Sequence, residues 1–325
     1  MPPFFLARNP QFSDGFLAIL RPPVAVGGLL ARSPESSAAP QEEDVFVVVS
    51  ARGGVVGYCG HVDLGTGIRT ALAQIIAEEL DIPFADVIMV LGDTDKAPNQ
   101  GATIASETIQ ISAVPLRKAA AQARKIILSL AADVTGLPAS SLKLDAGQVV
   151  ALKPHALENS IPYSQLLQGK NLTALLDEAV EVKNPEHYTV VGKKVSRVDI
   201  PDKVTGMAVY VHDVRVPDMV HGRVIRPPYG GFDHGPFVGN SLITVDRASI
   251  AHIPGVLDVV VIKDFVAVVA EREEQADAAA RQLRVDWHTP DLPDMEDIEA
   301  ALQANPSTPR VVHDQGDVEV ALGQL

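Results

Sequence analysis

The stretch that decides the fold is residues 60–70, which read Gly-His-Val-Asp-Leu-Gly-Thr-Gly-Ile-Arg-Thr. It follows a strand-like run and leads, through a glycine turn, into residues 70–80, whose apolar side chains recur at helical spacing. Glycine lets backbone amides approach a ligand closely, and a helix N-terminus adds unpaired donors and positive dipole character. This combination is typical of a site for an anion, most often a phosphate.

A second segment of similar character lies at residues 94–106, where small, hydroxyl-bearing and turn-forming residues precede another helix-like run. One strand-like run, residues 86–92, separates the two segments along the chain. Two such loops in one region predict a cofactor with a long phosphate-bearing tail.

Two other interpretations of the glycine turn stay open at this point. An isolated Gly65-x-Gly67 match is more often a plain strand-to-helix turn than a binding site. With threonine in place of a third glycine, the run also falls one residue short of a dinucleotide fingerprint, in which Asp93 would hold a ribose. The strand before the turn carries His61 and Asp63, whereas a buried parallel strand is almost wholly apolar, which argues against a nicotinamide site.

Length and charge restrict the classes of function. The chain has 325 residues, enough for two ordinary domains and for an enzyme. Its formal net charge of −14 and pI near 5.0 leave no basic stripe to follow phosphates, so we expect no nucleic-acid partner. No apolar run reaches the ~18 residues that a membrane span needs. We therefore expect a cytoplasmic chain that is not itself transmembrane, although its electron acceptor could be bound to a membrane.

Cysteine and histidine usage says where metals can sit. The single cysteine, Cys59, excludes an internal disulfide and cannot supply the thiolates of an iron–sulfur cluster. The nine histidines show no metal-ligand spacing with cysteine or carboxylate, so no metal-binding residue is predicted. No Ser-His-Asp or Cys-His arrangement follows from the spacing either, so no catalytic residue is predicted.

The first half of the chain predicts an arm and a β-α-β-α domain. Residues 1–44, rich in Pro, Ala and Ser, are expected to form a flexible N-terminal arm. The domain over residues 45–170 is expected to contain, in order, a hairpin at 45–61, a helix at 70–80, a strand at 86–92, a helix at 114–132 and a hairpin at 142–152. In the first helix, Glu78 and Glu79 are expected mostly on the face opposite the apolar residues.

The second half predicts a different texture. Charged residues 171–187 are expected to form a linker, and residues 188–288 a domain of short strands with interspersed helices. The expected strands are 208–212, 220–226, 242–245, 256–262, 265–271 and 284–288, and the expected helices 246–252 and 273–283. Residues 289–325, dominated by Pro, Asp and Glu at first, are expected to be a connector. The fold class predicted for the whole chain is α+β.

The motifs also resemble a known family. Residues 60–80, followed by Gly-Asp-Thr at 92–94 and Pro-Asn-Gln-Gly at 98–101, closely resemble the large molybdenum subunit of the xanthine dehydrogenase/aldehyde oxidase family. The most similar branch is that of nicotinate dehydrogenase and isoquinoline 1-oxidoreductase, through their B and beta subunits respectively. Residues 198–210 and 221–228 resemble the opening of the α/β hammerhead domain in this family. The resemblance implies a partial molybdopterin-binding domain at 45–170 and a hammerhead domain at 188–288.

The resemblance further implies a molybdenum hydroxylase. In such enzymes a molybdenum–pterin cytosine dinucleotide inserts a water-derived oxygen into a C–H bond of a small heteroaromatic or aldehyde substrate. The electrons leave through iron–sulfur clusters, which here would lie on a small partner subunit. In relatives the glycine turn, often Gly-Gln-Gly, lies against the pterin, and the hydroxyl-rich loop grips the cofactor. The cofactor-binding residues that this implies are Gly65, Thr66, Gly67, Gly101, Thr103, Ala105 and Ser106.

The chain departs from the family pattern in two ways. Thr66 stands where many relatives have glutamine. The family's catalytic glutamate, in a late Gly-x-Gly-Glu motif, has no counterpart before Leu325, so we expect another polypeptide to carry the C-terminal molybdopterin-binding half. Two functions stay open. The chain is either a component of a molybdenum hydroxylase, inactive in isolation, or a truncated, non-catalytic paralogue that keeps its fold and its partner or cofactor binding.

Overall fold

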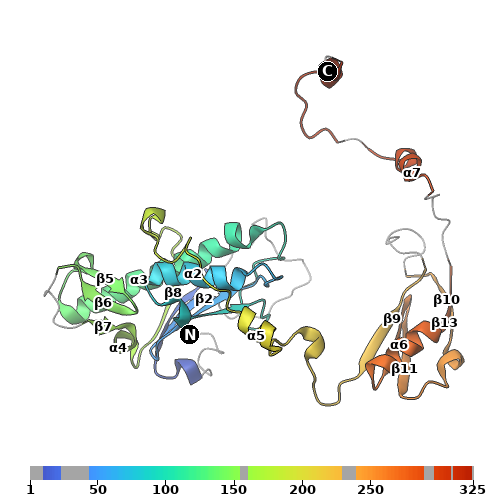
Figure 1. The fold of residues 1–325 in the computed structure, drawn as a ribbon, viewed down its shortest axis with the longest axis horizontal. Coiled ribbons are helices and arrows are strands. Elements are labelled where there is room, and N and C mark those ends of the chain that lie inside the picture. The colour runs from blue at the N-terminus through green and yellow to red at the C-terminus, as the bar shows by residue number, and fades with distance from the viewer. Residues whose placement is uncertain are drawn as a thin grey trace. The chain divides into compact units, whose positions relative to one another are not determined.

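The computed structural model describes residues 10–22, 44–153, 160–228, 239–288, 296–308 and 310–323. The described chain is a mixed α and β protein that divides into two compact units, Met1–Ala208 and Val209–Leu325. Figure 1 shows a sheet with helices packed on it in the first unit and a smaller sheet with its own helix in the second. Each unit has a buried apolar core of its own.

A five-stranded mixed sheet forms the centre of the first unit, in the order β4-β3-β2-β1-β8. Its strands are β1 (Phe16–Leu20), β2 (Val45–Ser50), β3 (Val55–Cys59), β4 (Val87–Leu91) and β8 (Asn171–Leu175). β2 pairs antiparallel with β1 and β3, whereas β3 with β4 and β1 with β8 pair in parallel. Every residue of β1, β2 and β3 is buried, because apolar clusters cover both faces of these strands.

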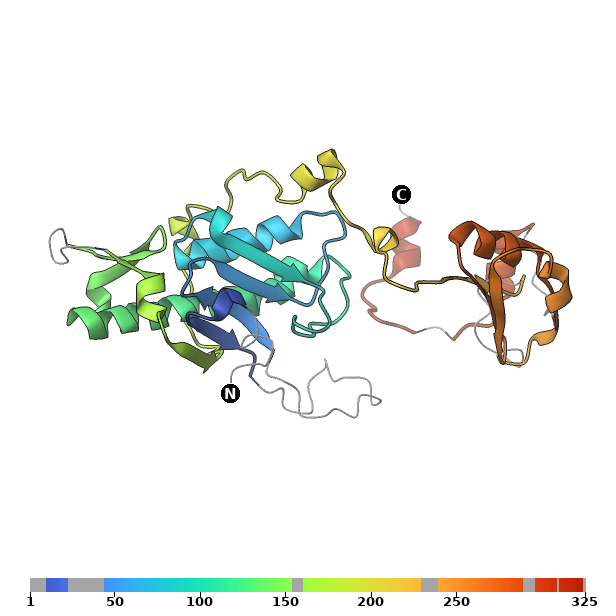
Figure 2. The same cartoon turned by 90° about the horizontal axis from the view of Figure 1, so that it is seen from below.

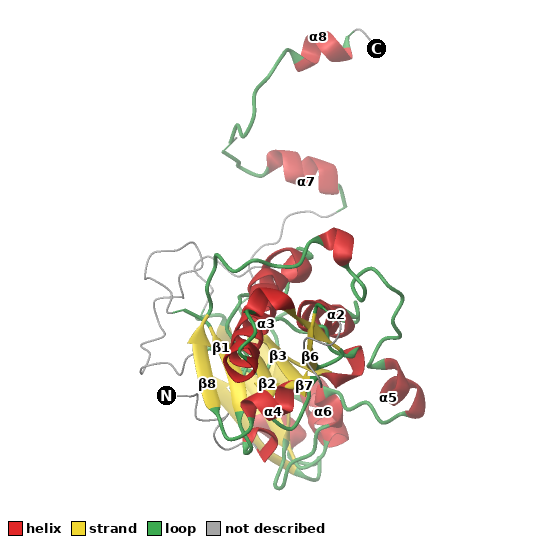
Figure 3. Ribbon diagram, turned by 90° about the vertical axis from the view of Figure 1, so that its left-hand side faces the viewer, coloured by secondary structure: helices red, strands yellow, loops and turns green. Residues whose placement is uncertain are grey.

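Helices α2 (Ile68–Leu80) and α3 (Ala113–Thr135) pack against each other on one face of this sheet, as Figure 3 shows. A π-helical turn, η3 (Thr108–Ser112), leads into α3. α2 ends at Asp81 and α3 at Gly136, and both of these residues adopt the left-handed conformation that closes many helices. The predicted β-α-β-α succession is confirmed, with small shifts of its bounds.

A small antiparallel sheet lies at the C-terminal end of α3 (Figure 2). It consists of β5 (Leu142–Asp145), β6 (Gln148–Ala151) and β7 (Ile161–Pro162), and α4 (Tyr163–Leu167) follows it. The Tyr163 hydroxyl donates to the carbonyl of Leu80, which ties this sheet to the end of α2. Short helical turns lie between the larger elements: η1 (Pro10–Phe12), η2 (Phe84–Asp86), η4 (Ala139–Ser141), η5 (Pro185–His187) and α5 (Ile200–Thr205).

The prediction of a flexible arm over residues 1–44 is wrong for residues 10–22. Phe16–Leu20 forms β1, an inner strand of the main sheet, because its five residues are all apolar and all find partners on β2 and β8. Residues 1–9 and 23–43 of the predicted arm lie outside the described residues. The predicted linker over 171–187 is likewise wrong at its start, where Asn171–Leu175 forms β8 parallel to β1.

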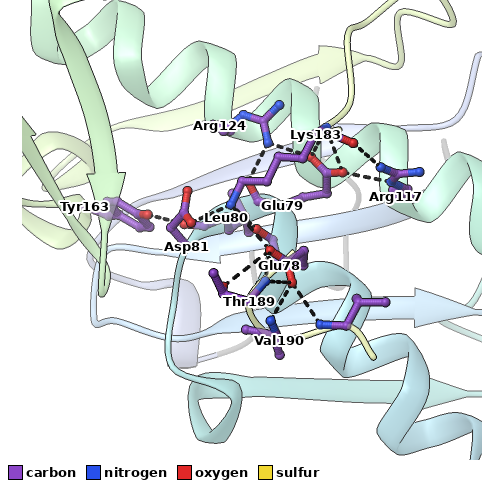
Figure 4. Close-up of polar contacts among 11 residues, drawn as sticks. Glu78, Glu79, Leu80, Asp81, Arg117, Arg124, Tyr163, Lys183, Thr189 and Val190 are labelled. Carbon is purple, nitrogen blue, oxygen red and sulfur yellow. Dashed lines mark hydrogen bonds and ion pairs between the residues drawn. The ribbon is translucent and has the colours of Figure 1, made fainter. Parts of the chain in front are cut away.

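Residues 177–199, here called the strap, run over α2 and α3 and are held by two buried carboxylates (Figure 4). Glu79 accepts hydrogen bonds from the side chains of Arg117 and Arg124 and from the backbone amide of Lys183. Glu78 accepts from the backbone amides of three consecutive residues, Thr189, Val190 and Val191. The expectation that these two glutamates lie on the exposed face of the helix is therefore wrong, since they are 2% and 0% exposed.

The second unit is built on an antiparallel sheet in the order β11-β12-β9, with α6 packed on it. A second, two-stranded antiparallel sheet joins β10 to β13. The elements are η6 (Val211–Asp213), β9 (His221–Ile225), β10 (Leu242–Asp246), η7 (Arg247–Ile250), β11 (Val256–Ile262), β12 (Phe265–Ala270), α6 (Glu273–Gln282), β13 (Arg284–Trp287), α7 (Ile298–Ala304) and α8 (Val318–Leu322). Its core joins Ile250, Val259, Val266 and Val268 to Ala279 of α6.

Most of the elements predicted for this half are confirmed, and two are not. The predicted strand 208–212 is instead irregular chain leading into the single 3₁₀ turn Val211–Asp213, and the predicted helix 246–252 is the 3₁₀ turn Arg247–Ile250. The unit begins after Ala208 and not at the predicted boundary of 188, because the strap is bound to the first unit. In the described part of the chain, no helix combines the length and the apolar character required to cross a membrane.

Candidate functional site

The two predicted loops follow neighbouring parallel strands, so they emerge at the same edge of the main sheet. The glycine turn (residues 60–67) follows β3, and the second loop (residues 98–106) comes after β4. The amide of Gly92, just past β4, donates to the carbonyl of Cys59 at 2.9 Å. In open sheets that contain parallel strands, ligands bind outside the carboxyl ends of those strands.

Direct contacts join the glycine turn to the second loop. The amide of Gly60 donates to Oε1 of Gln100 at 3.0 Å, and the amide of Val62 donates to Oγ1 of Thr103 at 3.0 Å. A Cβ atom on Gly60 would lie 2.1 Å from the carbonyl oxygen of Pro98, so only glycine permits this approach. The predicted convergence of the two loops is confirmed.

A buried histidine fixes both loops to the start of α3. His61 is 2% exposed, and its Nδ1 lies 2.8 Å from Oγ1 of Thr108. Its Nε2 lies 3.1 Å from Oγ of Ser112 and 3.3 Å from the carbonyl oxygen of Gln100. Thr108 and Ser112 bound the π-helical turn, a rare conformation that often marks functional sites. Sequence reasoning missed this role, although a histidine among apolar strand residues was a signal for it.

The amides of the glycine turn are already bonded within the protein. The Asp63 carboxylate accepts hydrogen bonds from the amides of Gly65, Gly67 and Arg69 at 2.9, 3.1 and 3.2 Å. Burial acts to raise the pKa of Asp63, but these three amides, with the charge of Arg197, hold that pKa below its ordinary value. Asp63 is therefore a carboxylate that shapes the turn, and these amides are not the anion donors that the glycine pattern predicted.

The second loop uses its glycine in a similar way. The amide of Gly101 donates to Oδ1 of Asn99 at 3.1 Å. Within the described chain, the amides of Thr66, Thr103, Ala105 and Ser106 find no acceptor. Among the predicted residues, the donors that remain for a ligand are therefore these four amides and the hydroxyl groups beside them.

Backbone conformation sets the predicted residues apart from ordinary loop residues. Gly65 and Gly101 have φ of 98° and 87°, and a Cβ on either would meet nothing within 4 Å, so the space in front of them is open. Ala105 and Ser106 have φ of 49° and 58°, although neither is glycine. Two successive residues in the left-handed region cost on the order of 1 kcal/mol each, and such strain is concentrated at functional sites.

A third segment, which sequence reasoning did not connect with the site, reaches the glycine turn from the strap. Nη1 of Arg197 donates to the carbonyl of Gly65 at 2.8 Å, and the amide of Val198 donates to Oγ1 of Thr70 at 3.1 Å. These residues lie far from the turn in sequence, and no local pattern pairs them. Throughout the described ranges, no cluster of three or more His, Cys, Asp or Glu side chains is arranged to hold a metal ion.

The sequence matches the family described as Molybdopterin cofactor-binding domain over residues 24–224. The chain belongs to this family. It is 52% identical to a nicotinate dehydrogenase subunit from Pseudomonas putida, over 94% of this chain and 26% of that protein. It is 30% identical to the beta subunit of isoquinoline 1-oxidoreductase from Brevundimonas diminuta, over 82% of this chain and 37% of that protein. The resemblance drawn from residues 60–80 is thus confirmed, and the nicotinamide interpretation is wrong.

The chain spans about a quarter of the length of the first of these relatives and just over a third of the second. Among solved structures, the reconstituted CO dehydrogenase from Oligotropha carboxidovorans matches 36% of this chain and 14% of its own, with 26% identity and a TM-score of 0.33. Asp93, the ribose ligand of the nicotinamide interpretation, instead pairs with Lys96 at 2.8 Å.

Proposed function

We propose that this chain is a component of a molybdenum hydroxylase, an oxidoreductase that adds a water-derived oxygen to a C–H bond of a heteroaromatic or aldehyde substrate. The single observation that carries the proposal is the pair of joined loops, at the carboxyl ends of β3 and β4, in a chain of the molybdopterin cofactor-binding family. The names of the two relatives, nicotinate dehydrogenase and isoquinoline 1-oxidoreductase, agree with a heteroaromatic substrate.

The residues at the two loops fit a molybdenum–pterin cytosine dinucleotide. Open space in front of Gly65 and Gly101 leaves room for a flat or extended group against the backbone. The hydroxyl of Thr103 accepts from Val62, so its proton is free for a cofactor oxygen, and the amides of Ala105 and Ser106 add uncharged donors. Uncharged donors bind an anionic tail without the burial of a lysine or arginine.

When bound, the molybdenum centre supplies the oxygen transfer to the C–H bond and receives the electrons. In this chain, the glycine turn would hold the pterin side of the cofactor through Gly65, Thr66 and Gly67. The second loop would hold the phosphate tail through Gly101, Thr103, Ala105 and Ser106. No charged side chain of this chain is assigned to the reaction, which belongs to another segment of the enzyme.

Partners follow from the same proposal. Leu64, at the tip of the glycine turn, and Ile104, in the second loop, are 71% and 60% exposed. Large apolar side chains in this position favour a covering polypeptide, and we assign it to the C-terminal molybdopterin-binding half of the enzyme. A small subunit with iron–sulfur clusters would carry the electrons away in the cytoplasm. The second unit would serve as the α/β hammerhead domain.

Purification of the tagged chain from its native host tests the proposal. We expect a molybdenum-containing polypeptide and an iron–sulfur polypeptide to copurify with it, and elemental analysis to find molybdenum in the assembly. The isolated chain should hold little molybdenum, because half of a cofactor site binds weakly. Copurification of neither partner would contradict the proposal and favour a non-catalytic paralogue.

A further inference from the structure

The strap brings one arginine to the glycine turn in a well-defined geometry. Nε and Nη2 of Arg197 donate to the two carboxylate oxygens of Asp199 at 2.9 and 2.6 Å. Nη1, the remaining nitrogen of the guanidinium, donates to the carbonyl of Gly65 at 2.8 Å. The Lys203 ammonium also lies 2.6 Å from Asp199, so the anchor of the arginine is itself held in place.

The same side chain also packs on the next glycine of the turn. A Cβ atom on Gly67 would lie 3.3 Å from Cδ of Arg197, which shows how closely the arginine stem approaches the backbone there. Arg197 is about two-thirds buried along its side chain. It therefore contacts the turn through one hydrogen bond and through its apolar stem.

The glycine turn needs such support because its backbone is intrinsically free. Gly65 and Gly67, with φ of 98° and 81°, belong to the residue type that loses the most conformational entropy on ordering. Asp63 fixes the N–H groups of the turn, and Arg197 fixes a C=O group of the same turn. Two opposite charges thus hold the two kinds of polar backbone group in three consecutive residues.

The strap itself is tightly bound, so the arginine is presented from a rigid support. Glu79 is fully buried and holds the amide of Lys183, and Glu78 holds the amides of residues 189–191 (Figure 4). Lys183 adds a contact to Asp81 at the end of α2. Breaking these contacts would leave carboxylates buried without donors, which is strongly unfavourable.

We propose that Arg197 is a positioning residue: with Asp199 as its anchor, its guanidinium fixes the shape of the glycine turn that faces the cofactor. The link to the cofactor rests on the proposed function, whereas the effect on the turn does not. Lysine cannot replace this arginine, because one ammonium cannot bind both Asp199 oxygens side-on and also reach the Gly65 carbonyl in the same plane.

Hydrogen exchange of the full 325-residue chain, followed by mass spectrometry of peptides, tests this proposal. In Arg197→Ala, the amides of residues 63–70 should exchange about tenfold faster, because a hydrogen bond from a charged donor is lost from the turn. Arg197→Lys should show nearly the same increase. Arg52→Ala is the matched control, since Arg52 binds Asp14 through Nε and Nη2 but is remote from the turn, and it should leave these amides unchanged.

Chemical rescue separates positioning from a general loss of structure. Millimolar guanidinium should restore slow exchange at residues 63–70 of Arg197→Ala, whereas the same concentration of sodium chloride should not. If Arg197→Ala also speeds exchange throughout α3, then Asp199→Asn replaces it, because this variant keeps the guanidinium and removes its anchor. Unchanged exchange at the turn in the variant used, or equal rescue by sodium chloride, would overturn the proposal.

The cofactor content of the assembled enzyme distinguishes this proposal from the proposed function. A looser turn together with reduced molybdenum content supports both. A looser turn with full molybdenum content supports the role of Arg197 and contradicts the assignment of the turn to the cofactor. A turn that does not loosen contradicts the role of Arg197, whatever the molybdenum content is.

Discussion

At the scale of single residues, the acidic pair on α2 illustrates where sequence and structure part. Glu78 and Glu79 occupy helix positions that look solvent-facing, yet both are buried beneath the strap. Their partners include backbone amides about a hundred residues away, at Lys183 and Val190. A backbone amide has the same identity at every position, so no residue pattern could have revealed these partners. The structure turns two apparent surface charges into the attachment of a whole segment.

The pH dependence of stability reports on Glu78. Burial acts to raise its pKa, but the amides of Val191, Val190 and Thr189 and the charge of Lys183 hold that pKa below the ordinary value of 4.5. Because the pKa is lower in the folded chain than in the unfolded chain, this stabilisation is complete above about pH 4.5 and disappears as the pH falls through the folded value. At pH 7, Glu78→Gln should lower the free energy of unfolding by about 2 kcal/mol, the range for hydrogen bonds to a charged group.

Urea unfolding at a series of pH values checks this prediction. The difference between Glu78→Gln and the unmodified chain should shrink as the pH falls below 4.5. Glu178→Gln is the control, because Glu178 pairs with Lys118 while its side chain is 66% exposed, and it should change stability little at any pH. A difference between Glu78→Gln and the unmodified chain that stays constant down to acid pH would show that the charge of Glu78 is not the source of the effect.

At the scale of elements, periodicity predicted those parts of the fold whose partners are near in sequence. α2 and α3, the β2–β3 hairpin and the β5–β6 hairpin followed from local spacing and turn residues. The pairing of β1 with β8 did not, because it joins Phe16 to Asn171 and depends on the complete sheet. The same limit applied to the site. Both loops could be located from their glycines, but the use of their amides by Asp63 and Asn99 required coordinates.

The contact between the two loops predicts the effect of one added methyl group. Gly60→Ala places a Cβ 2.1 Å from the Pro98 carbonyl oxygen, a backbone atom that cannot turn aside. We expect the loops to separate and the free energy of unfolding to fall by about 2 kcal/mol, as for other overpacked sites. Calorimetry measures the loss, and hydrogen exchange of residues 98–106 locates it.

Gly222→Ala is the control for this substitution. Its nearest neighbour to a new Cβ is the Val268 carbonyl oxygen at 3.8 Å, an ordinary contact, and its φ is not positive. It should leave the stability of the first unit unchanged. Equal melting temperatures for Gly60→Ala and Gly222→Ala, with no faster exchange at residues 98–106, would mean that the loops are not packed against each other as the structure has them.

At the scale of the whole molecule, the strap decides where the first unit ends. Composition places a domain boundary at residue 188, but the contacts of Glu78 with residues 189–191 and of Arg197 with Gly65 belong to the first unit. The unit therefore extends to Ala208. A charged, irregular segment looks like a linker in the sequence, because its hydrogen bonds are made to other parts of the chain and not within itself.

Two fragments separate these boundaries. Residues 1–208 should fold with the full stability of the first unit, whereas residues 1–187 should lose about 3 kcal/mol, because Glu78 stays buried without the amides it binds. The two changes should not add: Glu78→Gln should destabilise the longer fragment but be neutral or stabilising in the shorter one, where no strap amides face it. Urea unfolding of the four proteins measures this coupling. Equal effects of Glu78→Gln in both fragments would contradict the strap as the partner of Glu78, since the loss would then arise elsewhere in α2.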